Sequence, residues 1–298
     1  MDIAVRNLRD RLRGALIPAA ATPMTASGEV DLDLVSRYLA GLVADGATGL
    51  AVLAHTGRGP YLAPDVRAAV IERAVACAGK AGVPVLAGVG GGAEDPAAQA
   101  RVAAELGADG VLVFPSDGDR VALHEEVWRA ARLPMIAFDL YTRPCPAGTL
   151  RELLAHPGVA GLKTALLSDA MGCQRAIALA READRLAITG EDRMFGPSLL
   201  WGAEAALVGI AAASVGVTAA VLEAFAGKDL RAFEEASGRL DRLAQVTFTE
   251  PMEGYVQRML WLAAAEGRVP ETHSHDPYGP PLPAEERAVI VAMSQAAH

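Results

Sequence analysis

The sequence predicts a (β/α)8 barrel, in which eight short parallel strands alternate with helices. Eight short apolar runs lie between residues 15 and 210, and amphipathic stretches separate them. Most of these runs have a glycine at or near one end. Continuous apolar runs are typical of strands that are buried on both faces of a parallel sheet. Eight repeated strand and helix units favour a closed barrel, and a doubly wound open sheet is the main alternative.

The predicted strands follow one another with helical segments between them. We expect strands over Ala15–Ala21, Gly49–Leu53, Val83–Ala87, Gly110–Phe114, Leu133–Phe138, Val159–Lys163, Leu186–Thr189 and Ala205–Ile210. The first helices are expected from after Asp31 to about Ala44 and from about Pro64 to Gly79. Another begins near Asp95-Pro96, where proline suits a first helical turn.

The strand pattern stops after Ala226, and only helical patterns follow. Apolar spacing predicts helices over Leu230–Val246, Met252–Glu266 and Pro283–Ala297, with a Pro-rich loop at Val269–Leu282. We therefore expect a barrel over residues 1–226 and a helical region over residues 227–298 that packs on it.

The composition of the chain indicates where the protein is located and which kind of ligand it binds. The 298 residues are 52% hydrophobic, so the chain can bury a large core. Without an apolar run of about 18 residues or a signal peptide, a cytoplasmic location is expected and a membrane partner is not. The net charge of −9 argues against nucleic-acid binding and favours a small ligand. Cys77, Cys145 and Cys173 are widely spaced, and we expect them to be reduced.

Lys163 is the first candidate for catalysis, because lysine is rare in this chain. Only Lys80, Lys163 and Lys228 are lysines among the 27 basic residues, and Lys163 closes a predicted buried strand. A desolvated lysine loses its proton more readily than arginine and becomes a nucleophile that can form a Schiff base. The alternative is a lysine at a strand end whose ammonium group reaches solvent.

In a barrel, functional groups lie at the C-terminal ends of the strands. That rule selects the polar residues Thr22, His55, Thr56, Arg58, Asp139, Tyr141, Lys163, Glu191 and Asp192. The pair Thr56-Gly57 has a hydroxyl group and exposed main-chain N–H groups, which can hold a carboxylate. A Thr-Gly turn that only ends the strand is the alternative.

Four motifs resemble those of the dihydrodipicolinate synthase and N-acetylneuraminate lyase superfamily. They are Ala21-Thr22-Pro23, His55-Thr56-Gly57, Gly161-Leu162-Lys163 and Gly190-Glu191-Asp192, and the Pro-rich loop Gly279–Leu282 also fits. The resemblance spans nearly the whole chain. It implies that Lys163 forms a Schiff base with pyruvate or another 2-oxo acid, whose carboxylate Thr56 and Gly57 hold. Phe138, Glu191 and Leu207 are expected to contact the substrate, and similar proteins are tetramers or dimers.

The chain also departs from the pattern of that superfamily. Related enzymes carry Gly-Thr-Thr-Gly-Glu where this chain has Ala54–Arg58, and Tyr-Asn where it has Phe138-Asp139. A phenyl ring cannot relay protons as the tyrosine does. Phe114–Asp117 replaces the loop that sends a second tyrosine into a neighbouring subunit. His55 and Tyr141 are therefore candidates for the acid–base role, and a surface position is the alternative for Tyr141.

Arg58 stands where related enzymes have an acidic residue. A guanidinium close to Lys163 would help to keep the amine neutral, and it could bind a second carboxylate. A polar or diacid substrate would then suit the site better than pyruvate. The alternative is an ion pair with an acid such as Asp65.

Other motifs give weaker signals, and we expect neither a cofactor nor a metal. The glycine run Gly88–Ala93 lacks the acidic residue that a dinucleotide site needs after the next strand. His273–Asp276 contains possible metal ligands, but a solvated loop explains them more simply. His124 and His156 are expected at the surface or at helix ends.

These observations predict a lyase, either an aldolase or a dehydratase, that acts on a 2-oxo acid and possibly on a sugar acid. A 4-hydroxy-tetrahydrodipicolinate synthase and a barrel that binds a 2-oxo acid with little turnover are the alternatives. The residues do not identify the leaving group, the replacement for the missing tyrosine or the oligomeric state.

Overall fold

A computed structural model describes residues 1–297 and confirms the predicted (β/α)8 barrel. Its strands are β1 (Leu16–Pro18), β2 (Leu50–Val52), β3 (Val85–Val89), β4 (Gly110–Val113), β5 (Met135–Leu140), β6 (Val159–Ala165), β7 (Leu186–Thr189) and β8 (Ala205–Val208). They pair in parallel in the order β1-β8-β7-β6-β5-β4-β3-β2. A bridge between Ala19 and Ala51 then joins the segments of β1 and β2, so the open-sheet alternative is wrong.

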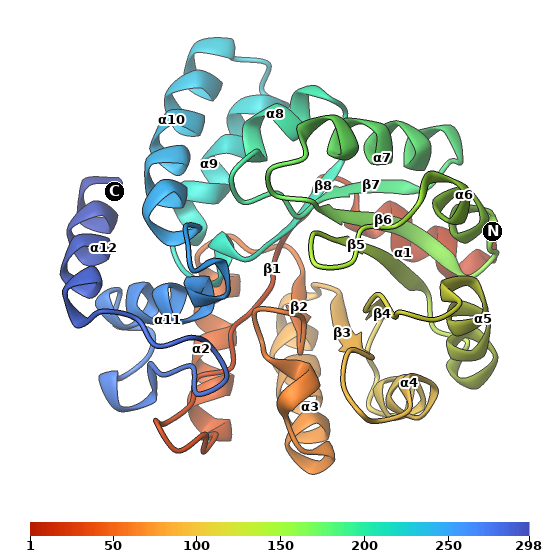
Figure 1. Cartoon of the computed structure of the whole chain (residues 1–298), viewed down its shortest axis with the longest axis horizontal. Helices are drawn as coiled ribbons and strands as arrows, with labels where there is room; N and C mark the ends of the chain where they lie inside the picture. Colours follow the sequence, from red (N-terminus) through yellow and green to blue (C-terminus); the bar gives the residue numbers. More distant parts are fainter. Residues whose placement is uncertain (298) are drawn as a thin grey trace.

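Helices surround the strands (Figure 1). They are α1 (Ile3–Leu12), α2 (Leu32–Ala44), α3 (Pro64–Ala81), α4 (Pro96–Glu105), α5 (Arg120–Ala131), α6 (Ala147–Ala155), α7 (Ala170–Glu182), α8 (Phe195–Leu200), α9 (Val215–Ala226), α10 (Leu230–Thr247), α11 (Tyr255–Ala265) and α12 (Ala284–Ala297). Short 3-10 turns occur at η1 (Gly59–Tyr61), η2 (Ile210–Ala212), η3 (Met252–Gly254) and η4 (Glu271–His273). No helix within residues 1–297 is both long and apolar enough to cross a membrane.

Helix α1 is not apparent in the sequence, because the charged residues at the start of the chain mask its apolar spacing. Asp2 caps this helix by accepting a hydrogen bond from the N–H group of Ala4. Val5, Leu8 and Leu12 are buried on its inner face, and the helix packs against β6. The apolar face of this helix therefore belongs to the hydrophobic core, and most of its charged residues face outward.

Two strands extend further than predicted, and this changes the position of Lys163. The fifth strand was predicted to end at Phe138, and the sixth at Lys163. In the structure Asp139 pairs with Thr164, and Leu140 pairs with Ala165, which extends β5 and β6 by two residues each. Asp139 is buried, so its polarity does not end the strand. Lys163 thus lies inside β6, between Phe138 on β5 and Ile188 on β7.

The C-terminal helices lie together at one side of the barrel (Figure 1). Helix α10 packs on α9, and α12 packs on both α10 and α11. The helix predicted from Met252 begins only at Tyr255, because η3 occupies the preceding three residues. Residues 248–254 connect α10 to α11, and together with Tyr255, the first residue of α11, they form a segment, residues 248–255, that reaches the strand ends.

Candidate active site

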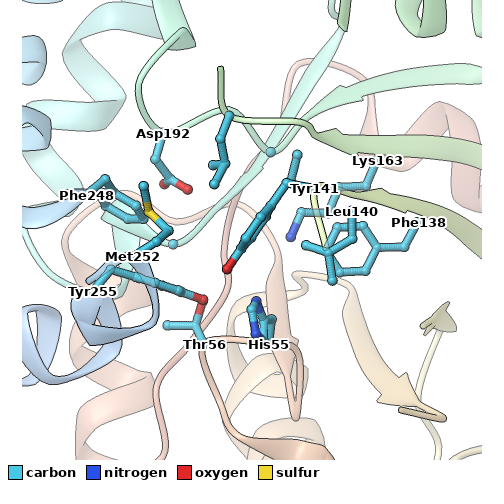
Figure 2. A pocket seen from close by; sticks show the side chains of 14 residues that line it. His55, Thr56, Phe138, Leu140, Tyr141, Lys163, Asp192, Phe248, Met252 and Tyr255 are labelled. Atoms are coloured by element: carbon cyan, nitrogen blue, oxygen red, sulfur yellow. The ribbon is translucent and has the colours of Figure 1, made fainter. Parts of the chain in front are cut away.

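A pocket opens at the C-terminal ends of the strands (Figure 2). Its polar side chains are those of His55, Thr56, Tyr141, Lys163, Asp192 and Tyr255. Its apolar side chains are those of Phe138, Leu140, Ala165, Leu167, Phe248 and Met252. The barrel supplies most of these residues, and segment 248–255 supplies Phe248, Met252 and Tyr255 from the opposite side.

Lys163 carries the buried amine of the pocket. Its side chain is 5% exposed, and Nζ lies 4.3 Å from the centre of the Phe138 ring. Burial lowers the pKa of Lys163 to about 8, although the nearby carboxylates of Asp192 and Glu191 partly oppose this shift. A larger fraction of the amine is therefore neutral near physiological pH than for a solvated lysine.

The glycine of Gly190-Glu191-Asp192 makes room for the lysine. A Cβ atom at Gly190 would lie 2.5 Å from Cε of Lys163 and 2.6 Å from the carbonyl oxygen of Thr164. Only glycine lets β7 approach this side chain so closely. Asp192 follows on the pocket wall, where it accepts a hydrogen bond of 2.7 Å from the N–H group of Ile210. Burial raises the pKa of Asp192 to about 7.

A tight turn after β2 places Thr56 in the pocket. Leu53 and Arg58 have φ angles of 58° and 52°, a conformation that side chains adopt only when the surrounding structure holds it. A Cβ atom at Gly57 would lie 2.9 Å from the carbonyl oxygen of Ala20, so glycine is required. The hydroxyl groups of Thr56 and Tyr255 lie 3.1 Å apart. Thr56 is thereby linked to the C-terminal segment.

Both His55 and Thr56 line the pocket, because β2 ends at Val52 and the strict alternation of strand side chains ends with it. Nε2 of His55 lies 3.2 Å from Oε2 of Glu253. The Tyr141 hydroxyl group donates a hydrogen bond to Oε1 of the same carboxylate. Burial, and then the contact with Glu253, raises the pKa of Tyr141 well above its usual value.

A sequence profile of the Dihydrodipicolinate synthetase family matches residues 12–296. The chain belongs to this family. A 4-hydroxy-tetrahydrodipicolinate synthase of Synechococcus sp. (strain WH7803) is 33% identical over 234 residues, which is 75% of this chain and 72% of that protein. A probable 5-dehydro-4-deoxyglucarate dehydratase of Streptomyces coelicolor is 31% identical over 311 aligned positions, with 97% and 92% covered. Three further synthases align over only 54–55% of their own length.

A solved structure supports the same fold. It is that of a prophage protein of the dihydrodipicolinic acid synthase family from E. coli K12, in complex with pyruvate. It superposes with a TM-score of 0.85 at 21% identity and covers 95% of this chain and 98% of the other. At this level of identity the likeness concerns the fold of the barrel.

Arg58 was expected to contact the substrate, but its side chain does not line the pocket. Its side chain is 1% exposed, and its guanidinium group lies 2.7 Å from Oδ2 of Asp276 and 2.9 Å from Oε2 of Glu253. These acids, and not Asp65, are its partners. The guanidinium is occupied within the protein, so the expected second carboxylate site is not assembled around Arg58.

Two other residues predicted to bind substrate face away from the pocket or lie beneath it. The carboxylate of Glu191 accepts hydrogen bonds from the N–H groups of Leu166 and Leu167, at 2.6 and 2.8 Å. It therefore holds the loop that follows β6. Leu207 is fully buried on β8 beside Ile17. Neither residue lines the pocket surface.

Three of the weaker sequence signals have structural explanations. The glycine run is required by packing, since a Cβ atom at Gly88 or Gly92 would lie 2.2 Å from the carbonyl oxygen of Leu53 or 2.6 Å from that of Pro60. The expectation of a surface position for His124 is wrong: it is 2% exposed inside α5. Asp276 pairs with Arg58. Within residues 1–297, no group of three or more His, Cys, Asp or Glu side chains is arranged to hold a metal ion.

Sequence reasoning missed the residues that segment 248–255 brings to the site. Phe248 stacks on Tyr255, with ring centres 4.8 Å apart, and Glu253 contacts both His55 and Tyr141. The helical spacing from Met252 hid this segment, because it suggested a regular helix there. Pro251 and Gly254 are the local signals that could have indicated a break.

Proposed function

We propose that this protein is a lyase that forms a Schiff base between Lys163 and the keto carbon of a 2-oxo acid. The observation that carries this proposal is the buried amine of Lys163, whose pKa burial lowers to about 8. In the reaction Nζ attacks the keto carbon, and water leaves to give an iminium ion. The positive nitrogen then withdraws electrons from the substrate, which makes a proton on the next carbon easier to remove.

The turn at Thr56 and Gly57 is the proposed site for the carboxylate of the substrate. Thr56 faces the pocket with its hydroxyl group, and Gly57 follows in the same turn. Within residues 1–297, the N–H groups of Thr56 and Gly57 donate no hydrogen bond to another main-chain group. Preorganised hydroxyl and N–H donors of this kind stabilise an anion without reorganising during the reaction.

His55 is the proposed proton relay. Phe138 occupies the position of the usual tyrosine next to Lys163, and its ring carries no exchangeable proton. The Tyr141 hydroxyl group donates to Glu253, and its raised pKa keeps the phenol protonated, so it cannot accept a proton from the substrate. His55 lines the same pocket, and imidazole is the side chain that most often transfers protons in enzymes.

The chemistry favoured by this site is cleavage or dehydration of a 2-oxo sugar acid. Once the proton has left the carbon next to the iminium, an enamine forms, and a hydroxyl group on the following carbon can leave as water. The relative from Streptomyces coelicolor, which aligns over 97% of this chain, is named as a probable dehydratase, and this supports the assignment. A 4-hydroxy-tetrahydrodipicolinate synthase is the alternative, and the relative from Synechococcus favours it.

Borohydride trapping tests the Schiff base directly. The protein is incubated with pyruvate and a panel of 2-oxo sugar acids, reduced, and measured by intact mass and peptide mapping. We expect the mass of the reduced adduct at Lys163, its loss in Lys163→Ala, and no change in Lys228→Ala, whose lysine is exposed. Adduct formation in Lys163→Ala equal to that in the unmodified protein would contradict the proposal. Product analysis with each acid then distinguishes dehydration, aldol cleavage and synthase activity.

A further inference from the structure

Glu253 joins three side chains that come from separate parts of the barrel rim. Oε2 lies 3.2 Å from Nε2 of His55 and 2.9 Å from Nη1 of Arg58, while Oε1 accepts from the Tyr141 hydroxyl group. Glu253 itself belongs to η3, outside the eight strand and helix units. The carboxylate of Glu253 therefore contacts both His55 and Tyr141, the two candidates for general acid–base catalysis.

The buried ion pair between Arg58 and Asp276 also holds the main chain at Glu253. Nη2 of Arg58 donates to the carbonyl oxygen of Glu253 at 3.0 Å and to Oδ2 of Asp276 at 2.7 Å. The side chains of Arg58 and Asp276 are 1% and 0% exposed. Because both charges are buried and paired, breaking this ion pair would leave an uncompensated charge inside the protein. Arg58 thus holds the main chain from which Glu253 contacts His55 and Tyr141.

Glu253 remains an anion in this setting. Burial alone would raise the pKa of Glu253, but hydrogen bonds from His55, Tyr141 and Arg58 take it well below its usual range. A permanent carboxylate beside Nε2 favours the tautomer in which that nitrogen carries the proton and donates it. The other ring nitrogen, Nδ1, is then left as the base.

We propose that Glu253 is a positioning residue that orients His55 for proton transfer in the Schiff-base reaction. This inference rests on the proposed function. The proton leaves the carbon next to the Lys163 iminium, is taken up by Nδ1 of His55, and later returns from the same nitrogen to substrate or leaving group. Glu253 holds the Nε2 proton throughout and is not itself protonated. Tyr141 occupies the second carboxylate oxygen and so restricts rotation of the carboxylate.

A purely structural role for Glu253 as a partner of Arg58 explains less of the geometry. Asp276 already accepts from both Nε and Nη2 of Arg58. The Glu253 side chain is 39% exposed, so its pairing with Arg58 alone contributes little stability. Neither point accounts for the contacts with His55 and Tyr141, which a positioning role requires.

Hydrogen exchange of pyruvate tests this role without knowledge of the full substrate. In deuterium oxide, formation and reversal of the enamine replaces the methyl protons of pyruvate with deuterium, and NMR measures the rate. We expect Glu253→Gln to slow exchange about 10- to 100-fold through kcat, with KM changed less than about twofold, because only proton transfer is impaired. Borohydride trapping of pyruvate at Lys163 should persist. Glu234→Gln, on the exposed face of α10, is the matched control.

A double substitution separates positioning from general damage. If Glu253 acts through His55, then His55→Ala/Glu253→Gln should exchange as slowly as His55→Ala alone. Effects that multiply in the double variant, or a rate in Glu253→Gln equal to that of Glu234→Gln, would overturn the role of Glu253 while trapping persists. Absence of trapping in the unmodified protein would instead overturn the Schiff base on which it rests.

Should Glu253→Gln prove poorly folded by circular dichroism, Glu253→Ala with added formate provides a second route. Restoration of exchange by formate, and not by chloride at equal concentration, supports a missing carboxylate at this position. No restoration in a folded Glu253→Ala protein contradicts it.

Discussion

The two walls of the pocket are built in different ways. On one wall, Lys163 and Phe138 are neighbours in adjacent strands, and Gly190 at the end of β7 gives the lysine its space. On the other wall, His55 meets Glu253 through contacts between segments that lie far apart in the sequence. The first wall follows from the order and register of the barrel strands. The second wall depends on how the C-terminal segment folds over the rim. Its residues could therefore differ while Lys163 keeps its position.

Substitution of His55 gives the largest expected contrast between the two walls. His55→Ala should retain borohydride trapping at Lys163 and lose about 10²- to 10⁴-fold in pyruvate exchange, the usual contribution of a general acid–base group. Tyr141→Phe should lose less than about tenfold, because its hydroxyl group only supports Glu253. The reverse ranking of the two variants would assign the relay to Tyr141.

Substitution of Arg58, which holds the second wall, should lower the free energy of unfolding of the protein. Arg58→Ala leaves the buried carboxylate of Asp276 without its partner, which costs about 3–5 kcal/mol in the free energy of unfolding. Urea denaturation measures this change. The control Arg231→Ala removes an exposed pair on α10 and should cost only about 0.3–0.5 kcal/mol. A loss in Arg58→Ala as small as that of the control would show that the buried pair does not anchor the segment.

The pH dependence of borohydride trapping tests the first wall alone, through the amine of Lys163. We expect it to be the smallest of the effects. Burial lowers the pKa of Lys163 to about 8, so the neutral amine dominates above that pH and falls about tenfold per pH unit below it. The initial rate of imine formation with pyruvate should therefore rise up to about pH 8 and then level off. A rate that continues to rise up to pH 10 would mean that the amine behaves like a solvated lysine.

The sequence predicted the first wall far better than the second. The apolar run around Gly161 identified β6, and its single lysine stood out because the chain otherwise uses arginine. The partner of Arg58 could not be found in this way, because Asp276 lies 218 residues further along the chain. Whether His55 faces the pocket also depended on where β2 ends, and helical spacing at Met252 concealed the break that presents Glu253.

The ion pair between Arg58 and Asp276 has a consequence for the order in which the protein is made. Translation proceeds from the N-terminus, so the ribosome completes Lys163 and its strand long before Asp276 is synthesised. Until then Arg58 lacks the carboxylate that neutralises it in the folded protein, and His55 lacks Glu253. The nascent barrel therefore carries its amine before the opposite wall of the site exists, and residues that are synthesised later complete that wall.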